Sequence, residues 1–186
     1  MSVAADEIAG RNLPAWAGED HVCDSCSLAY AQTTIDNAVQ AIQALPAQLR
    51  AAVDAVPPGA RRQRPGPSTW SVAEYACRIR DVLISSTIRL HRGRTETGPA
   101  VDPMFGDLRA ELFGYNQANL TAVLEETAAA VAGLCQEVSR MNDPDWDRVV
   151  LRQPGEQRTT RWLVRQAMHE GLHHLADIAA VHTSLT

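Results

Sequence analysis

Residues 169–173, spelled HEGLH, are the part of the sequence whose residue types and spacing most directly suggest chemistry. Two histidines four residues apart in a helix share one face, so the imidazoles of His169 and His173 can reach a single metal ion. The same spelling occurs in zinc proteases, where the glutamate is the general base. On a helical wheel, however, Val164 and Met168 mark the core face, and Glu170 points away from a metal shared by the histidines. Proteolysis is therefore not favoured.

Two interpretations of His169 and His173 stay open at this level. In one, the imidazoles border the hydrophobic core and form hydrogen bonds within the protein. In the other they belong to a site, because Trp162 and Asp177 fall close to the same side of the helix and together describe a groove between helices. His174 lies on the opposite flank, and we expect it to be exposed to solvent.

A second pattern is Cys23-Asp-Ser-Cys26, within a segment of residues 1–31 that lacks sustained periodicity and is typical of a loop. A Cys-x-x-Cys pair supplies half of a zinc site, and even with the nearby His21 a fourth ligand would have to come from a distant helix. Redox chemistry is less favoured, because no βαβ pattern surrounds the pair. The two cysteines are therefore either zinc ligands or structural thiols.

Four long helices are expected to position these residues. Apolar residues recur every three or four positions in two segments, and Ser71 and Glu74 form a capping box that begins another helix. The predicted helices cover residues 33–56, 71–91, 116–141, and from Thr159 or Thr160 to nearly the C-terminus. The connection 93–113 is long enough to line or cover a site, and residues 149–157 resemble a hairpin. The pattern predicts an all-α four-helix bundle with long connecting loops.

The composition narrows the class of protein. The 186 residues fit one domain covering 1–186, and a hydrophobic share of 45% with few aromatic residues suits close-packed helices. A net charge of -5 argues against a nucleic-acid partner. No stretch approaches the roughly 18 apolar residues of a membrane span, and no signal-peptide pattern is present. We therefore expect a cytoplasmic protein without a membrane partner, whose cysteines are not in disulfides.

Several segments, in order along the chain, resemble those of DinB-like proteins. Residues 70–83, WSVAEYACRIRDVL, are similar to the second helix of that family, and residues 162–178 resemble its last helix. Residues 115–117 and 146–148 stand where the family has similar segments, and the Cys-x-x-Cys pair resembles the start of many actinobacterial members. The resemblance covers nearly the whole chain.

The resemblance implies an enzyme that acts on a small molecule and forms a homodimer. The family includes S-transferases that use mycothiol or bacillithiol, and the mycothiol-dependent maleylpyruvate isomerase. Its members typically bind one divalent metal, such as zinc or nickel, through one histidine of the second helix and a His-x-x-x-His pair of the last. The resemblance therefore implies that His169 and His173 are two ligands of a metal that lowers the pKa of the cofactor thiol.

The chain departs from this family pattern at Arg78, which stands where the family has its first metal ligand. Gln166 similarly replaces a histidine often found one turn before His169. A guanidinium has no lone pair to coordinate a metal, so the departure puts the metal in doubt. Three interpretations follow. Arg78 pairs with Glu74 and Asp81 on its own helix. It replaces the charge of the metal and holds an anion or an oxyanion. Or a metal is kept through other ligands.

In the last case Cys23 or Cys26 would complete the ligand set with His169 and His173. We predict a small-molecule transferase or isomerase whose site lies between the second and fourth helices. Arg78, His169 and His173 are expected to face one another there, with either histidine as general acid or base. The residues expected to contact substrate are Glu74, Tyr115, Trp162 and Asp177. A metal-independent cyclase or isomerase and a non-catalytic binding or stress-associated protein are the alternatives.

Overall fold

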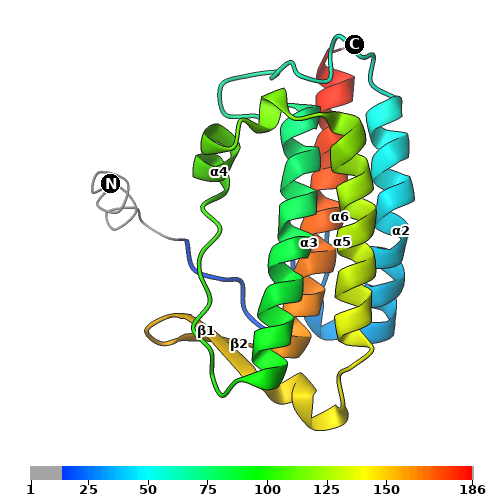
Figure 1. Cartoon of the computed structure of the whole chain (residues 1–186). Coiled ribbons are helices and arrows are strands. Elements are labelled where there is room, and N and C mark those ends of the chain that lie inside the picture. The colour runs from blue at the N-terminus through cyan, green and yellow to red at the C-terminus, as the bar shows by residue number, and fades with distance from the viewer. Residues whose placement is uncertain (1–13, 186) are drawn as a thin grey trace.

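The computed structural model describes residues 14–185 and consists mainly of four long helices that run side by side (Figure 1). They are α2 (Ile35–Asp54), α3 (Val72–Thr95), α5 (Leu120–Val138) and α6 (Thr160–Leu185). The connections contain a short helix, α4 (Gly106–Leu112), and an antiparallel hairpin of β1 (Val149–Gln153) and β2 (Glu156–Thr159). Three 3-10 turns are η1 (Tyr30–Gln32), η2 (Tyr115–Gln117) and η3 (Asp143–Asp147). The predicted all-α four-helix bundle is confirmed.

Each long helix of the bundle packs mainly against two of the other three. Both α2 and α3 pack against α5 and α6, so α2 and α3 occupy opposite corners. At the contact between α2 and α6, a Cβ atom added to Gly171 would lie only 2.6 Å from Leu45 Cδ1. Gly171 therefore lets the two helices approach closely. This packing fixes the rotation of α6 about its own axis, and that rotation decides which way each polar residue of α6 faces.

The start of α3 is the capping box expected from the sequence. The Ser71 amide donates to Glu74 Oε2 at 2.8 Å, and the Glu74 amide donates to Ser71 Oγ at 3.3 Å. The carboxylate of Glu74 also accepts from Arg64 Nε at 2.8 Å. The helix continues to Thr95, about one turn beyond the predicted end. Glu74 is thus fully engaged in capping the start of α3 and holding the preceding loop.

The helix predicted from residue 116 begins later than expected. Residues 115–117 form η2, and α5 starts at Leu120 because Asn119 accepts from the Thr121 amide at 3.0 Å and caps the helix. A side chain that accepts hydrogen bonds from the amides after it replaces the main-chain bonds of a further helical turn, so the helix does not extend towards residue 116.

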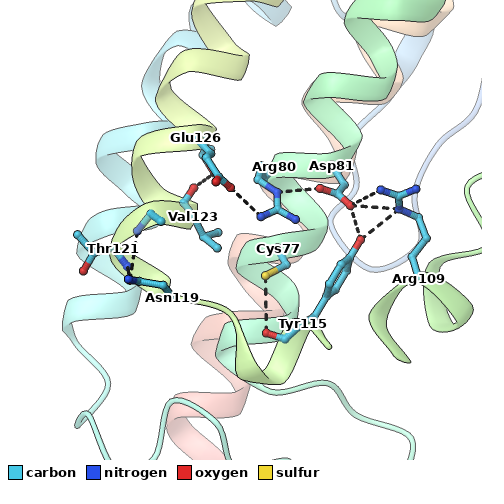
Figure 2. Close-up of polar contacts among 11 residues, drawn as sticks. Cys77, Arg80, Asp81, Arg109, Tyr115, Asn119, Thr121, Val123 and Glu126 are labelled. Atoms are coloured by element: carbon cyan, nitrogen blue, oxygen red, sulfur yellow. Dashed lines mark hydrogen bonds and ion pairs between the residues drawn. The ribbon is translucent and has the colours of Figure 1, made fainter. Parts of the chain in front are cut away.

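The connection between α3 and α5 is pinned to α3 by one buried carboxylate, Asp81 (Figure 2). It accepts from the hydroxyl of Tyr115, from Arg109 Nη2 at 2.8 Å and from Arg80 Nε at 2.8 Å. Arg80 also reaches Glu126 on α5 at 2.8 Å. These contacts place α4 beside α3. Asp81 and Tyr115 therefore have a structural role in holding the connection to the bundle.

The described N-terminal segment, residues 14–31, lies against the start of α6 and the hairpin. The indole Nε1 of Trp162 donates to the Gly18 oxygen at 3.0 Å, and Arg158 Nη2 donates to the Trp16 oxygen at 2.7 Å. The Trp16 and Trp162 rings lie 5.1 Å apart. Together with an apolar cluster around Tyr30 and Trp162, these contacts hold the segment in place. Within residues 14–185, no helix has the length and apolar character needed to span a membrane.

Candidate functional site

An open cavity of about 550 Å³ lies between α3, α6 and the segments that cover them. It is lined by residues 14–17, by Arg78, Val82, Ser86 and Arg89 of α3, by residues 104–108, by Arg152 of β1, and by Gln166 and Glu170 of α6. Three guanidinium groups therefore face two carboxylates, those of Asp107 and Glu170. We call this the arginine cavity. It lies between the two helices that the sequence predicted to form the site.

Arg78 reaches across the cavity from α3 to α6. Its Nη2 donates to Glu170 Oε2 at 2.9 Å, and its Nη1 lies 3.8 Å from Met104 Sδ. The interpretation in which Arg78 pairs with Glu74 and Asp81 is wrong, because those carboxylates are bound to other groups, as described above. The guanidinium is instead one half of an interhelical ion pair, with 16% of its side chain exposed.

Glu170 belongs to a row of polar side chains along α6. Gln166 Nε2 donates to Glu170 Oε1 at 2.8 Å, and His174 Nε2 lies 3.4 Å from Glu170 Oε2. The Nδ1 atom of His174 is 2.8 Å from Asp177 Oδ2. The expectation that His174 is solvated is therefore wrong, because its side chain is only 16% exposed and lies between two carboxylates.

The ion pairs of this row set the charge state of its members. Burial raises the pKa of Glu170, but the close approach of His174 and the charge of Arg78 outweigh it and hold that pKa at about 2. Burial lowers the pKa of His174, but the hydrogen bond to Asp177 and the nearby charge of Glu170 outweigh it and raise that pKa. Glu170 is thus a carboxylate at neutral pH, and His174 is biased towards the imidazolium.

The other two arginines of the cavity flank Trp16. The guanidinium carbon of Arg152 lies 4.6 Å from the Trp16 ring centroid, and that of Arg89 lies 5.6 Å from it. Arg152 is paired with Glu156 at 2.6 Å. Within residues 14–185 Arg89 has no carboxylate partner, and its guanidinium donates to the main-chain oxygen of Asp102. Burial, followed by the charges of Arg152 and Arg78, lowers the pKa of Arg89 to about 10.

The two histidines of the HEGLH segment lie elsewhere, beside the Cys-x-x-Cys turn. Cys23, Cys26, His169 and His173 each present one ligand atom, and these four atoms all lie within 4.8 Å of one another. We call these residues the Cys/His cluster. The Cys23 Sγ atom is 3.7 Å from His173 Nδ1. None of the four lines the arginine cavity. The structure therefore brings the two sequence patterns together, although they are far apart in the chain.

Arg78, His169 and His173 were expected to face one another in one site. In the structure Arg78 instead contacts Glu170, and the two histidines lie beside the cysteines. Consecutive residues of a helix point about 100° apart, so His169 faces the N-terminal segment while Glu170 faces α3. A metal held by three groups at Arg78, His169 and His173 therefore does not fit this chain. Two thiols and two imidazoles, in contrast, are a donor set that suits zinc.

The residues predicted to contact substrate are placed mostly in the fold itself. Glu74, Tyr115 and Trp162 are buried, have partners of their own and do not line the cavity. Asp177 holds His174 and borders a smaller hollow near the end of α6. Arg89 and Arg152, which line the cavity, were not among the residues predicted from the sequence. Arg89 lies three helical turns after Arg78, a spacing that the sequence shows, whereas no pattern pointed to Arg152.

Comparisons with known proteins agree with this architecture. The structure of YfiT from Bacillus subtilis, described as a probable metal-dependent hydrolase with an unusual four-helix bundle topology, matches with a TM-score of 0.76 and 19% identity. The match covers 88% of this chain and 93% of that one. The mycothiol-dependent maleylpyruvate isomerase matches with a TM-score of 0.63 and 14% identity, over 80% of this chain and 62% of that one.

At these identities both structures show a shared fold alone. The comparison with curated proteins found no match. The sequence model of the DinB superfamily matches residues 41–178, which is well over half of the chain. The resemblance seen in the sequence is therefore confirmed, and the chain belongs to the DinB superfamily.

Proposed function

We propose that this protein is a small-molecule enzyme of the isomerase or transferase type, which binds an anionic substrate in the arginine cavity. The observation that carries the proposal is Arg89, a half-buried guanidinium without a carboxylate partner in the described chain, close to two further arginines. Like charges in a partly desolvated site repel one another, and a bound carboxylate or phosphate relieves that repulsion. Guanidinium groups also match the planar geometry of such anions.

Arg78 has the position and the support expected of a group that stabilises negative charge. Its pairing with Glu170 fixes its orientation across the cavity, and its charge is permanent, as that of a metal ion would be. Oriented charges of this kind lower the energy of an enolate or oxyanion that forms during a reaction. We therefore assign charge stabilisation to Arg78 and substrate binding to Arg89 and Arg152.

Backbone strain at the cavity wall supports a binding role for this region. Phe105, which precedes α4 and lines the cavity, has a φ of 43° in the left-handed region. This conformation is costly for a bulky side chain, and such strain collects at functional sites. His169 and His173 receive no acid–base role in the proposal, because they lie outside the cavity wall. The predicted homodimer stays a prediction.

The second candidate is a non-catalytic binding protein. The observation that favours it is the composition of the wall, which within the described chain contains no histidine or cysteine. Its carboxylate on α6, Glu170, has a pKa of about 2 and is therefore a weak base. In this alternative the cavity binds an anion without transforming it.

The two candidates are tested with one set of ligands. Maleylpyruvate carries two carboxylates and is the compound named for the related isomerase, so it is the first probe, with and without mycothiol. Binding is measured by calorimetry and conversion by NMR. We expect binding to weaken at least about tenfold in Arg89→Met, because a charge-assisted hydrogen bond is lost. Arg140→Met, which removes an exposed cation outside the cavity, is the control.

Conversion that is lost in Arg78→Gln supports the enzyme. If maleate, phosphate or maleylpyruvate binds in a manner that depends on Arg89 but none is converted, the binding protein is supported instead of the enzyme. If no anion binds, or binding is equal in the Arg89 and Arg140 variants, both candidates fail.

A further inference from the structure

The structure assigns a zinc site of two cysteines and two histidines, made by Cys23, Cys26, His169 and His173, which fastens the N-terminal segment to α6. The site is separate from the arginine cavity and does not depend on the function proposed for it. Four protein ligands complete the tetrahedral coordination of zinc, so this is a stabilising site without an open position.

The distances in the Cys/His cluster fit such a centre. Bonds of about 2.3 Å to sulfur and about 2.0 Å to nitrogen separate the two kinds of ligand by about 3.6 Å around a tetrahedral ion. The observed separation between Cys23 Sγ and His173 Nδ1 is 3.7 Å. All four ligand atoms already lie within 4.8 Å of one another, so side-chain shifts of about 1 Å close the set.

The backbone around the two cysteines forms a tight turn that directs both thiols to the same place. An antiparallel bridge joins Val22 to Ala29, and within it the Ser27 amide donates to the Cys23 oxygen at 2.8 Å. Ser27 has a φ of 58°, a left-handed conformation that reverses the chain directly after Cys26. The turn brings the thiols to α6 although Cys23 and His173 are 150 residues apart.

A chain of hydrogen bonds prepares His169 as a ligand. The carboxylate of Glu170, paired with Arg78, can only accept, so the amide nitrogen of Gln166 must face it. The amide oxygen of Gln166 then accepts from the hydroxyl of Tyr30. That hydroxyl has given its hydrogen to Gln166, so at 2.9 Å its oxygen accepts from Nδ1–H of His169.

This order of donors places the lone pair of His169 on Nε2. Within the described chain, Nε2 is buried and has no hydrogen-bond partner. An unpaired buried nitrogen is costly, and a metal ion satisfies it. Histidine ligands typically donate their other N–H to an acceptor, which is the role of Tyr30 here. The nearest carboxylate oxygen to Nε2 of His173 is Asp177 Oδ2 at 4.0 Å, a charge contact rather than a hydrogen bond.

The zinc site would also hold one wall of the arginine cavity in place. Residues 14–17 line the arginine cavity and are continuous with the turn that carries the two cysteines. A zinc ion bound by that turn and by α6 holds the whole segment, because the unfolded chain cannot bring the four ligands together.

The test measures metal directly. Protein is reduced, stripped with a chelator, reloaded with Zn²⁺ or Co²⁺, desalted, and measured by elemental analysis and absorption. We expect one ion per chain, with the strong visible absorption of tetrahedral cobalt and thiolate charge-transfer bands in the near ultraviolet. Both signals are expected to be lost in the double variant Cys23→Ser/Cys26→Ser and in His169→Ala. Cys135→Ser and His91→Ala change the same residue types outside the cluster and should keep the ion.

A second measurement uses the wild-type chain, so it does not depend on whether variants fold. Removing the metal should lower the melting temperature by about 10 °C and speed hydrogen exchange in residues 16–30, with α5 unchanged. A reduced wild-type chain that binds no cobalt overturns the proposal. So does one equivalent of metal retained in the double cysteine variant, or hydrogen exchange that is insensitive to the chelator.

Discussion

The Cys/His cluster and the arginine cavity are built from neighbouring residues of one helix, yet they offer opposite chemistry. His169 and His173 lie beside two thiols, and the Nε2 atom of His169 is buried without a hydrogen-bond partner in the described chain. Glu170 and His174, each one residue further along, face α3 and are bound in ion pairs with Arg78 and Asp177. One helix therefore serves two sites, each through a pair of residues spaced four apart. The pair that can donate to a metal and the pair held in ion pairs differ by one position in the sequence.

The largest effect is expected when the guanidinium of Arg78 is replaced by a side chain that can coordinate a metal ion. In Arg78→His a neutral imidazole replaces the guanidinium opposite Glu170 and His174, whose facing atoms are 3.4 Å apart, as on one tetrahedral ion. We expect the chain to bind a second equivalent of zinc or cobalt. Arg78→Gln removes the charge without adding a ligand and should bind none beyond the first. Equal stoichiometry in the two variants would show that this position cannot hold a metal.

The next effect concerns a carboxylate that belongs to neither site. Asp81→Asn breaks the buried network of Figure 2 and should reduce the free energy of unfolding by about 3 kcal/mol, with metal content unchanged. Burial raises the pKa of Asp81, but hydrogen bonds from Tyr115, Arg80 and Arg109 outweigh it and lower that pKa below the usual 3.8.

A depressed pKa means that the charge of Asp81 stabilises the fold above about pH 3.8 and that this contribution is lost as the pH falls through the folded-state value. Urea unfolding of the wild type and of Asp81→Asn should therefore differ most between pH 5 and 7, and the difference should shrink below about pH 4. A difference that grows in acid would contradict this assignment of the charge.

A smaller change separates the metal ligands from their supports. Tyr30→Phe keeps the ring but removes the hydroxyl that accepts from His169. Metal affinity should fall by about 10- to 100-fold, as is typical when an outer partner of a ligand is lost. Competition with a chelating dye measures the affinity. Tyr75→Phe, which alters a tyrosine outside the cluster, should retain wild-type affinity.

The smallest effect tests whether the two sites can be altered independently. Glu170→Gln leaves Arg78 without its partner, so anion binding should tighten by about tenfold. The new amide oxygen can still accept from Gln166, so metal content should not change. Calorimetry with phosphate and elemental analysis of the same sample measure both quantities. Loss of metal together with altered anion binding would mean that the two regions form one site.

Much of the fold followed from local signals in the sequence. The capping box at Ser71 and Glu74, the apolar periodicity of α2 and α5, and the threonine start of α6 depend on neighbours within a few residues, and such signals predict helices well. The boundaries of α5 were less accurate, because the capping residue Asn119 lies inside the predicted segment.

The arrangement of the site could be predicted only in part. Periodicity showed that His169 and His173 share a face, but not whether that face meets α3 or the N-terminal segment. The answer depends on the rotation of α6, which the close contact of Gly171 with Leu45 fixes. Arg152 reaches the cavity from a hairpin whose direction no local pattern encodes. The pairing of Arg78 with Glu170 likewise joins residues on different helices, so wheel geometry on one helix could not reveal it.

The separation of 150 residues between Cys23 and His173 also has a consequence for folding. A chain leaves the ribosome N-terminus first, so the cysteine turn is made long before α6 exists to receive it. Contacts of such high sequence separation pay a large loop-closure entropy and form late. The thiols therefore stay accessible during synthesis, and docking of the N-terminal segment becomes one of the last events in the maturation of the bundle.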